Sequence, residues 1–81
     1  MSYQQAIQML QQGNFQQARD VLHALPLDFH TANLLGIVGQ LLQDWTAAEQ
    51  DYNWILKRDP QDASALYNLG NVRGSEGDWQ S

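Results

Sequence analysis

The chain has 81 residues, 16% of them charged, and a formal net charge of −5 at pH 7. With four fixed cations, it lacks the basic patches that nucleic acids and anionic membrane surfaces require, and without cysteine it has neither disulfides nor thiolate metal sites. No run of about 18 apolar residues could span a bilayer, and the first residues do not resemble a secretion signal, so we expect a single small cytoplasmic domain.

Apolar spacing and turn residues predict two helices in the first part of the chain. The first covers about residues 3–12 and ends at Gly13, because glycine accepts the left-handed conformation that closes a helix. Asn14 is expected to cap the second helix, about residues 15–24, which Pro26 ends. The apolar stripes are Tyr3, Ala6, Ile7 and Leu10 on the first helix and Ala18, Val21, Leu22 and Leu25 on the second.

Three aspartates are placed to begin three more helices, because an aspartate side chain accepts hydrogen bonds from the free N–H groups of a first turn. They are Asp28, Asp44 and Asp62, and the helices cover about residues 29–42, 45–58 and 63–75. Pro60 ends the fourth helix. The connections are short, so successive helices must lie antiparallel.

Five residues recur after an interval of 34 (60 − 26 = 34 and 79 − 45 = 34). They are Pro26, Asp28, Gly36, Asp44 and Trp45, which return as Pro60, Asp62, Gly70, Asp78 and Trp79. A fixed period of this length is typical of stacked helical repeats. Each unit of such a stack buries its apolar face against its neighbours and leaves a concave surface for partners.

The repeated residues resemble the tetratricopeptide repeat, most fully in the middle copy. That copy matches at Leu35-Gly36, Asp44-Trp45, Ala48, Tyr52, Ile55 and Pro60. The first copy matches at Ala6, Gly13-Asn14-Phe15, Ala18, Leu22 and Pro26, and the last at Leu66, Leu69-Gly70, Asn71 and Gly77-Asp78-Trp79. The resemblance implies an all-α fold of about five helices, in which antiparallel helix-turn-helix repeats stack as a right-handed α-solenoid. It divides the single domain 1–81 into a short copy at 1–28, a full copy at 29–62 and a truncated copy at 63–81.

Small residues stand where the family's helix backbones approach closely. They are Ala6, Ala18, Gly36, Ala48 and Gly70. We therefore expect Gly70→Leu to destabilise the stack by overpacking at a helix crossing. The chain departs from the family's pattern at Gly39 and Arg73, where a large aromatic is usual, and at Gln5, where leucine is usual.

The resemblance implies a non-enzymatic scaffold that holds a protein or peptide segment in its concave groove. The groove candidates are Asn33, Ile37, Gln40 and Leu41 on the third helix and Tyr67, Asn68, Asn71 and Ser75 on the fifth. Family members that clamp acidic tails carry cations where this chain has Tyr3, Ile7, His30, Asn33, Ser64 and Asn68. None of these six is a fixed cation, so we expect an uncharged, apolar or basic partner. We expect no cofactor, metal or catalytic residue, because the two histidines lie on different helices and no nucleophile motif occurs.

Two alternatives to a binding scaffold stay open from the sequence. The chain could be the amino-terminal part of a larger enzyme, such as a glycosyltransferase, or of an assembly factor, with its activity encoded beyond Ser81. It could also be an acidic docking surface for a basic protein. We expect the truncated copy to leave Leu66, Leu69 and Trp79 without a second helix to cover them. We favour a fragment of a longer repeat protein, and the rival explanation is a homo-oligomer that covers this copy by self-association.

Overall fold

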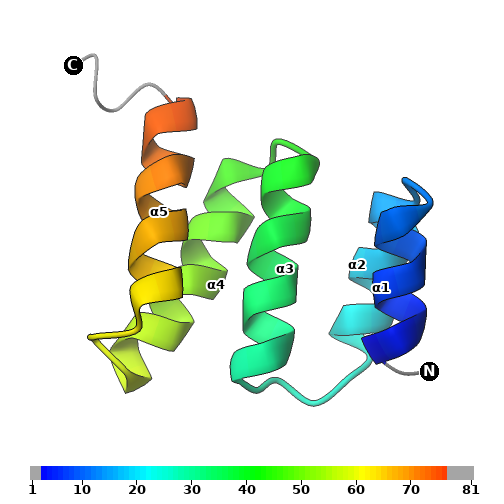
Figure 1. Cartoon of the computed structure of the whole chain (residues 1–81), viewed down its shortest axis with the longest axis horizontal. Coiled ribbons are helices and arrows are strands. Elements are labelled where there is room, and N and C mark those ends of the chain that lie inside the picture. Colours follow the sequence, from blue (N-terminus) through cyan, green and yellow to red (C-terminus); the bar gives the residue numbers. More distant parts are fainter. Residues whose placement is uncertain (1–2, 77–81) are drawn as a thin grey trace.

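The computed structural model describes the backbone of residues 3–76 and the side chains of residues 3–74. This part of the chain is a succession of helices (Figure 1). They are α1 (Tyr3–Gln11), α2 (Phe15–His23), α3 (Phe29–Leu41), α4 (Trp45–Arg58) and α5 (Ala63–Glu76). The described residues contain no strand, so the predicted all-α class is confirmed for this part of the chain. Each predicted helix boundary lies within one residue of the observed one. The repeat residues Asp78 and Trp79 lie outside the described residues.

The three predicted aspartate caps are confirmed. Asp28, Asp44 and Asp62 each accept a hydrogen bond from the backbone N–H three residues further on, over 2.8, 3.3 and 2.9 Å. Each bond satisfies one of the N–H groups that the first turn of a helix leaves without a partner. These short-range bonds explain why α3, α4 and α5 begin where they do.

The predicted cap at Asn14 is wrong. The Asn14 side chain makes no capping hydrogen bond and instead donates to the Gln12 side chain over 3.3 Å. The backbone closes this turn by itself, because Gly13 takes a φ of +83° and the Asn14 N–H donates to the Met9 carbonyl over 2.8 Å. The helix boundary therefore depends on the glycine rather than on the asparagine.

Consecutive helices run in opposite directions and pack on one another, α1 on α2 and so on to α5. In Figure 1, α1, α3 and α5 form the front layer, and α2 and α4 lie behind them. The helix α3 is central and contacts both α2 and α4. The front layer therefore presents one continuous face that is built from every second helix.

The apolar core consists of two clusters that meet at α3. The first cluster joins α1, α2 and α3 through Ala6, Ala18, Val21, Leu22, Leu35 and Val38. The second joins α3, α4 and α5 through Ala32, Ala48, Tyr52, Ile55, Ala65, Leu69 and Val72. Because α3 contributes to both clusters, a wide part of its surface is apolar. Phe15, the first residue of α2, packs against the first cluster, and Trp45, the first residue of α4, packs against the second.

Two glycines let α3 and α4 approach closely. A Cβ atom added at Gly36 would lie 2.5 Å from the Tyr52 ring, and one added at Gly39 would lie 3.1 Å from Ala48. Neither position could hold a larger side chain without moving α4. The absence of an aromatic residue at position 39 therefore has a packing reason in this chain.

The prediction that Gly70 lies at a helix crossing is wrong. Gly70 is exposed, and no atom of the described residues lies within 4 Å of an added Cβ atom. Gly36 is tightly packed because α4 covers it, whereas no described helix covers the equivalent side of α5. Overpacking at Gly70 is therefore not expected in the described structure.

Candidate functional site

The front face carries a hollow of about 340 Å³ between α1 and α3. Tyr3 and Ile7 of α1 form one wall, and His30, Asn33 and Leu34 of α3 form the other. Most of this lining is apolar, and the Asn33 amide and the His30 ring provide its polar groups. Such a mixture suits an apolar side chain with one or two hydrogen bonds to fix its orientation.

A second, smaller hollow of about 180 Å³ lies on the other side of α3. It is lined by Phe29, His30, Asn33, Ile55, Asp62 and Ser64. His30 and Asn33 line both hollows, so the first turns of α3 separate two adjacent depressions. A ligand that crosses α3 at this point could fill both and pass over the Asn33 amide.

Five of the six positions that the sequence analysis compared with acidic-tail clamps line these two hollows. They are Tyr3, Ile7, His30, Asn33 and Ser64. No fixed cation lines either hollow, and the Asp62 carboxylate borders the smaller one. This charge distribution disfavours an acidic ligand.

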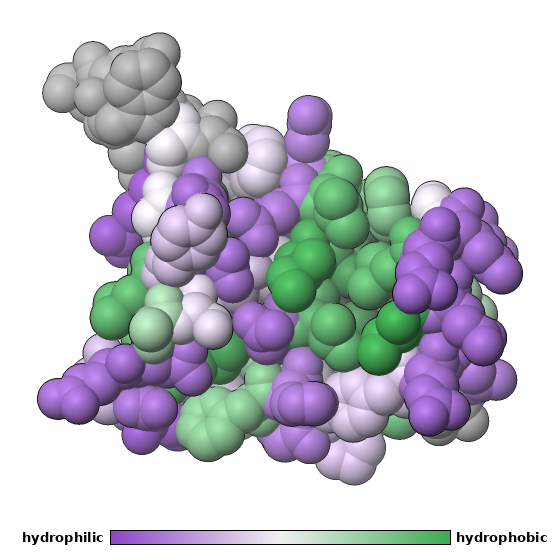
Figure 2. Space-filling model, in the orientation of Figure 1, coloured by the Kyte–Doolittle hydropathy of each residue, from purple (hydrophilic) through white to green (hydrophobic). Residues whose placement is uncertain are grey.

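A largely apolar area covers the part of the front face that α1 and α3 form (Figure 2). The exposed large apolar side chains of these two helices are Ile7, Phe29 and Leu41. Apolar side chains gathered around a hollow are more informative than single exposed ones, because contiguous apolar surface on a soluble domain commonly marks a binding region.

A hydrogen-bond network fixes the wall that α1 contributes. The Tyr3 hydroxyl donates to Asp28 Oδ1 over 2.6 Å and also contacts the Thr31 hydroxyl. The Tyr3 ring meets the His30 ring edge-on, with centroids 5.6 Å apart. The hydrogen bond from Tyr3 lowers the pKa of Asp28, because it stabilises the carboxylate form. These contacts tie α1 to the start of α3 and hold the larger hollow open.

The predicted groove residues of α3 differ in whether their side chains are free to contact a ligand. Asn33 lines both hollows, and Ile37 is half-buried one turn further along. Leu41 is exposed at the end of the helix. Gln40 is already engaged, because its Oε1 accepts a hydrogen bond from the Tyr52 hydroxyl over 2.7 Å. Gln40 therefore helps to hold α4 in place, which sequence spacing did not reveal.

The predicted groove residues of α5 line neither hollow. Tyr67 is 71% exposed, Asn71 is exposed, and Asn68 is half-buried. The side chain of Ser75 lies outside the described part of the chain. The structure thus brings Asn33 together with residues of α1 and does not gather the α5 candidates around the same hollows.

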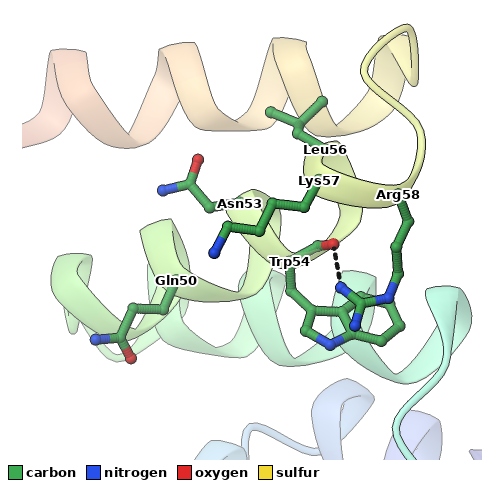
Figure 3. Close-up of a pocket in the computed structure, with 6 residues that line it drawn as sticks. All are labelled: Gln50, Asn53, Trp54, Leu56, Lys57 and Arg58. Atoms are coloured by element: carbon green, nitrogen blue, oxygen red, sulfur yellow. Dashed lines mark hydrogen bonds between the residues drawn. The ribbon is translucent and has the colours of Figure 1, made fainter.

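A hollow of about 660 Å³ lies along α4 and was not anticipated from the sequence (Figure 3). It is lined by Gln50, Asn53, Trp54, Leu56, Lys57 and Arg58. The Arg58 guanidinium stacks 3.9 Å from the centre of the Trp54 ring, and its Nη1 donates to the Trp54 carbonyl over 3.1 Å. A spacing of four residues between tryptophan and arginine was the available signal. All six residues come from one helix, so this hollow is a shallow flank without opposing walls.

Within residues 3–74, no three histidine, aspartate or glutamate side chains converge closely enough to hold a metal ion. The longest described helices have 14 residues, and none combines the length and apolar character that a membrane crossing requires. The two hollows on the front face each bring together residues from different parts of the chain.

Similarity to known proteins does not indicate a function for this chain. Comparisons of the chain with models of protein families, with curated proteins and with solved structures found no significant match. The function must therefore be inferred from the residues and from their geometry.

Proposed function

We propose that this chain is a non-enzymatic interaction module that holds a peptide segment of another protein across α3. In this proposal the helices form a tetratricopeptide-like stack, a right-handed α-solenoid whose concave side is the front face. The period of 34 residues and the alternation of front and back helices support that arrangement. The observation that carries the proposal is the pair of hollows that share His30 and Asn33.

The chemistry of the two hollows indicates how a peptide would be held. An apolar side chain of the peptide fits between Tyr3, Ile7 and Leu34 in the larger hollow. The Asn33 amide offers both a donor and an acceptor, so it can bond to the peptide backbone whatever side chains follow. The smaller hollow, beside the Asp62 carboxylate, suits a neutral polar or basic side chain.

The test begins with peptides selected from a random display library on the whole protein, followed by affinity measurements with purified variants. Asn33→Ala should weaken binding by about tenfold, because it removes hydrogen bonds at the centre of the contact. Asn53→Ala is the matched control, since Asn53 is also a half-buried asparagine but lies in the hollow along α4. Selected peptides that respond to Asn53→Ala and not to Asn33→Ala would overturn the proposal.

Salt provides an independent check on the chemistry. Binding through apolar contacts and amide hydrogen bonds should change little when the ionic strength is raised, because screening acts mainly on exposed charges. A steep loss of affinity with added salt would instead favour the acidic docking surface for a basic protein.

A further inference from the structure

The helix α5 has one buried side and one open side. Ala65, Leu69 and Val72 are buried in the second core cluster. On the adjacent side, Leu66 is 51% exposed, and Gly70 and Arg73 are exposed as well. We call the side made by Leu66, Gly70 and Arg73 the open face of α5.

The equivalent side of α3 is completely covered. The interval of 34 residues places the open face of α5 in register with Ala32, Gly36 and Gly39 (66 − 34 = 32, 70 − 34 = 36, 73 − 34 = 39). All three of these α3 residues are buried. The reason at Gly36 is the Tyr52 ring of α4, which lies where a Cβ atom would be. The packing of α4 on α3 thus shows what kind of helix can cover this side of a repeat helix.

We propose that the open face of α5 docks an amphipathic helix of a partner protein, which places an aromatic ring on Gly70 as Tyr52 does on Gly36. Gly70 would leave room for the ring, and Leu66 would lose its exposed apolar surface. This surface lies apart from the two hollows, none of whose lining residues belongs to the open face. The chain would therefore hold a second protein element independently of the peptide across α3.

Arg73 specifies a further property of the partner helix. Its counterpart Gly39 has the Ala48 backbone 3.1 Å from an added Cβ atom, so a side chain at position 73 prevents the same close approach at that end. Because Arg73 keeps the two helix backbones further apart at that end, a partner carboxylate has room there and would pair with the guanidinium. The expected partner thus carries an aromatic residue near the middle of its apolar stripe and an acidic residue one turn earlier.

A second copy of this chain fits the open face less well. The Tyr52 ring of each copy is already buried against its own Gly36. Tyr67, the exposed aromatic of α5, follows Leu66 directly and so lies about 100° round the helix from it. Two copies would also bring together two chains of net charge −5. These features favour a different protein as the occupant.

The probe is a synthetic peptide with the sequence of residues 44–59 and the substitution Ala48→Glu, which supplies the acidic residue opposite Arg73. It is titrated into the isotope-labelled whole protein, and the backbone amide signals are followed by NMR. The signals of Leu66, Gly70 and Arg73 should move, and those of Asn33 and Ile37 should not. A peptide in which the Tyr52 equivalent is also alanine should bind at least about tenfold more weakly.

Substitutions in the protein complete the test. Gly70→Leu should abolish the response while the protein stays folded, because the added side chain points into open space. Gln17→Leu is the control, since it adds the same side chain at an exposed position of α2. The proposal is overturned if the peptide moves no signals of the open face, or if Gly70→Leu leaves its binding unchanged. A concentration-dependent dimer that Gly70→Leu converts to a monomer would show that a second copy occupies the face and would equally overturn it. Failure of this test leaves the peptide site across α3 standing, because different signals report on it.

Discussion

At the residue scale, Gly36 and Gly70 occupy equivalent positions of the 34-residue repeat but have opposite surroundings. The Tyr52 ring lies 2.5 Å from the Cβ position of Gly36, and the Tyr52 hydroxyl is held by Gln40, so the ring cannot swing away freely. Within the part of the chain that the structure describes, nothing lies within 4 Å of the Cβ position of Gly70. The cost of adding a side chain therefore depends on the covering helix rather than on the glycine itself.

Alanine substitutions at the two glycines should change stability in opposite directions. Gly36→Ala should lower the free energy of unfolding by about 1–3 kcal/mol through overpacking against the Tyr52 ring. Gly70→Ala should raise it by about 0.5–1 kcal/mol, because alanine has the higher helix propensity and meets no neighbour. Urea unfolding of the two variants and the wild type measures both effects. Equal destabilisation by both substitutions would contradict the observed packing of α5.

The carboxyl group of Asp51 provides a prediction about pH. Burial raises its pKa to about 6, the charge of Asp44 adds to the shift, and the charge of Arg19 opposes it. In the unfolded chain the pKa of this carboxyl group is close to 3.8, the ordinary value for aspartate. Between these values the folded protein holds a proton that the unfolded chain has lost, so this contribution to stability is present at low pH and lost as the pH rises towards 6.

Asp51→Asn should therefore stabilise the protein at pH 7.5 by about 1–2 kcal/mol, after allowance for partial solvent screening, and should have little effect near pH 4. Asp44 behaves in the opposite way, because its hydrogen bond with Arg19 lowers its pKa, and its contribution is lost only as the pH falls below the usual aspartate range. Urea unfolding at the two pH values makes the comparison. Asp20→Asn, at an exposed position of α2, serves as the control. An equal effect of Asp51→Asn at both pH values would refute the proposed burial of charge.

At the scale of the element, helix boundaries follow from local chemistry, and the four predicted caps show where that reasoning holds. All three aspartates that precede a first turn accept a hydrogen bond from a backbone N–H group of that turn. The asparagine at position 14 did not, because its amide turns to Gln12 and the Gly13 turn is closed by backbone bonds.

The cap difference can be measured directly. Asp62→Ala should lower the free energy of unfolding by about 1 kcal/mol, because it leaves the Ala65 N–H at the start of α5 without its acceptor. Asn14→Ala should have an effect near zero, since no capping bond is lost. Thermal unfolding followed by circular dichroism distinguishes the two. A loss at Asn14→Ala as large as that at Asp62→Ala would mean that the asparagine does cap α2 in solution.

At the scale of the whole molecule, α3 joins the two core clusters and should make the domain unfold as one unit. Leu35 and Val38 belong to the first cluster, and Ala32 belongs to the second. Loss of either cluster would expose one side of α3, so neither half retains a complete core alone. A domain of this size commonly unfolds in a single cooperative step.

Leu22→Ala in the first cluster should lower the free energy of unfolding by about 2–4 kcal/mol. Trp45 and Trp54 pack against the second cluster and report on it by fluorescence. The fluorescence transition of Leu22→Ala should therefore shift together with the circular dichroism transition, although the substitution is in the other cluster. Two separate transitions would show that the clusters unfold independently.

The sequence by itself determined the all-helical class and the helix boundaries, because breakers, aspartate caps and apolar spacing act within a few residues of the positions they control. It also placed Asn33 on the front face through helical spacing. Only the tertiary structure decided that Gln40 is engaged by Tyr52, that the hollows form between α1, α3 and the start of α5, and that Gly36 is covered while Gly70 is open. Gly36 and Gly70 occupy the same place in the sequence repeat, and what distinguishes them is whether another helix lies against them, a property of three-dimensional packing that no local pattern contains.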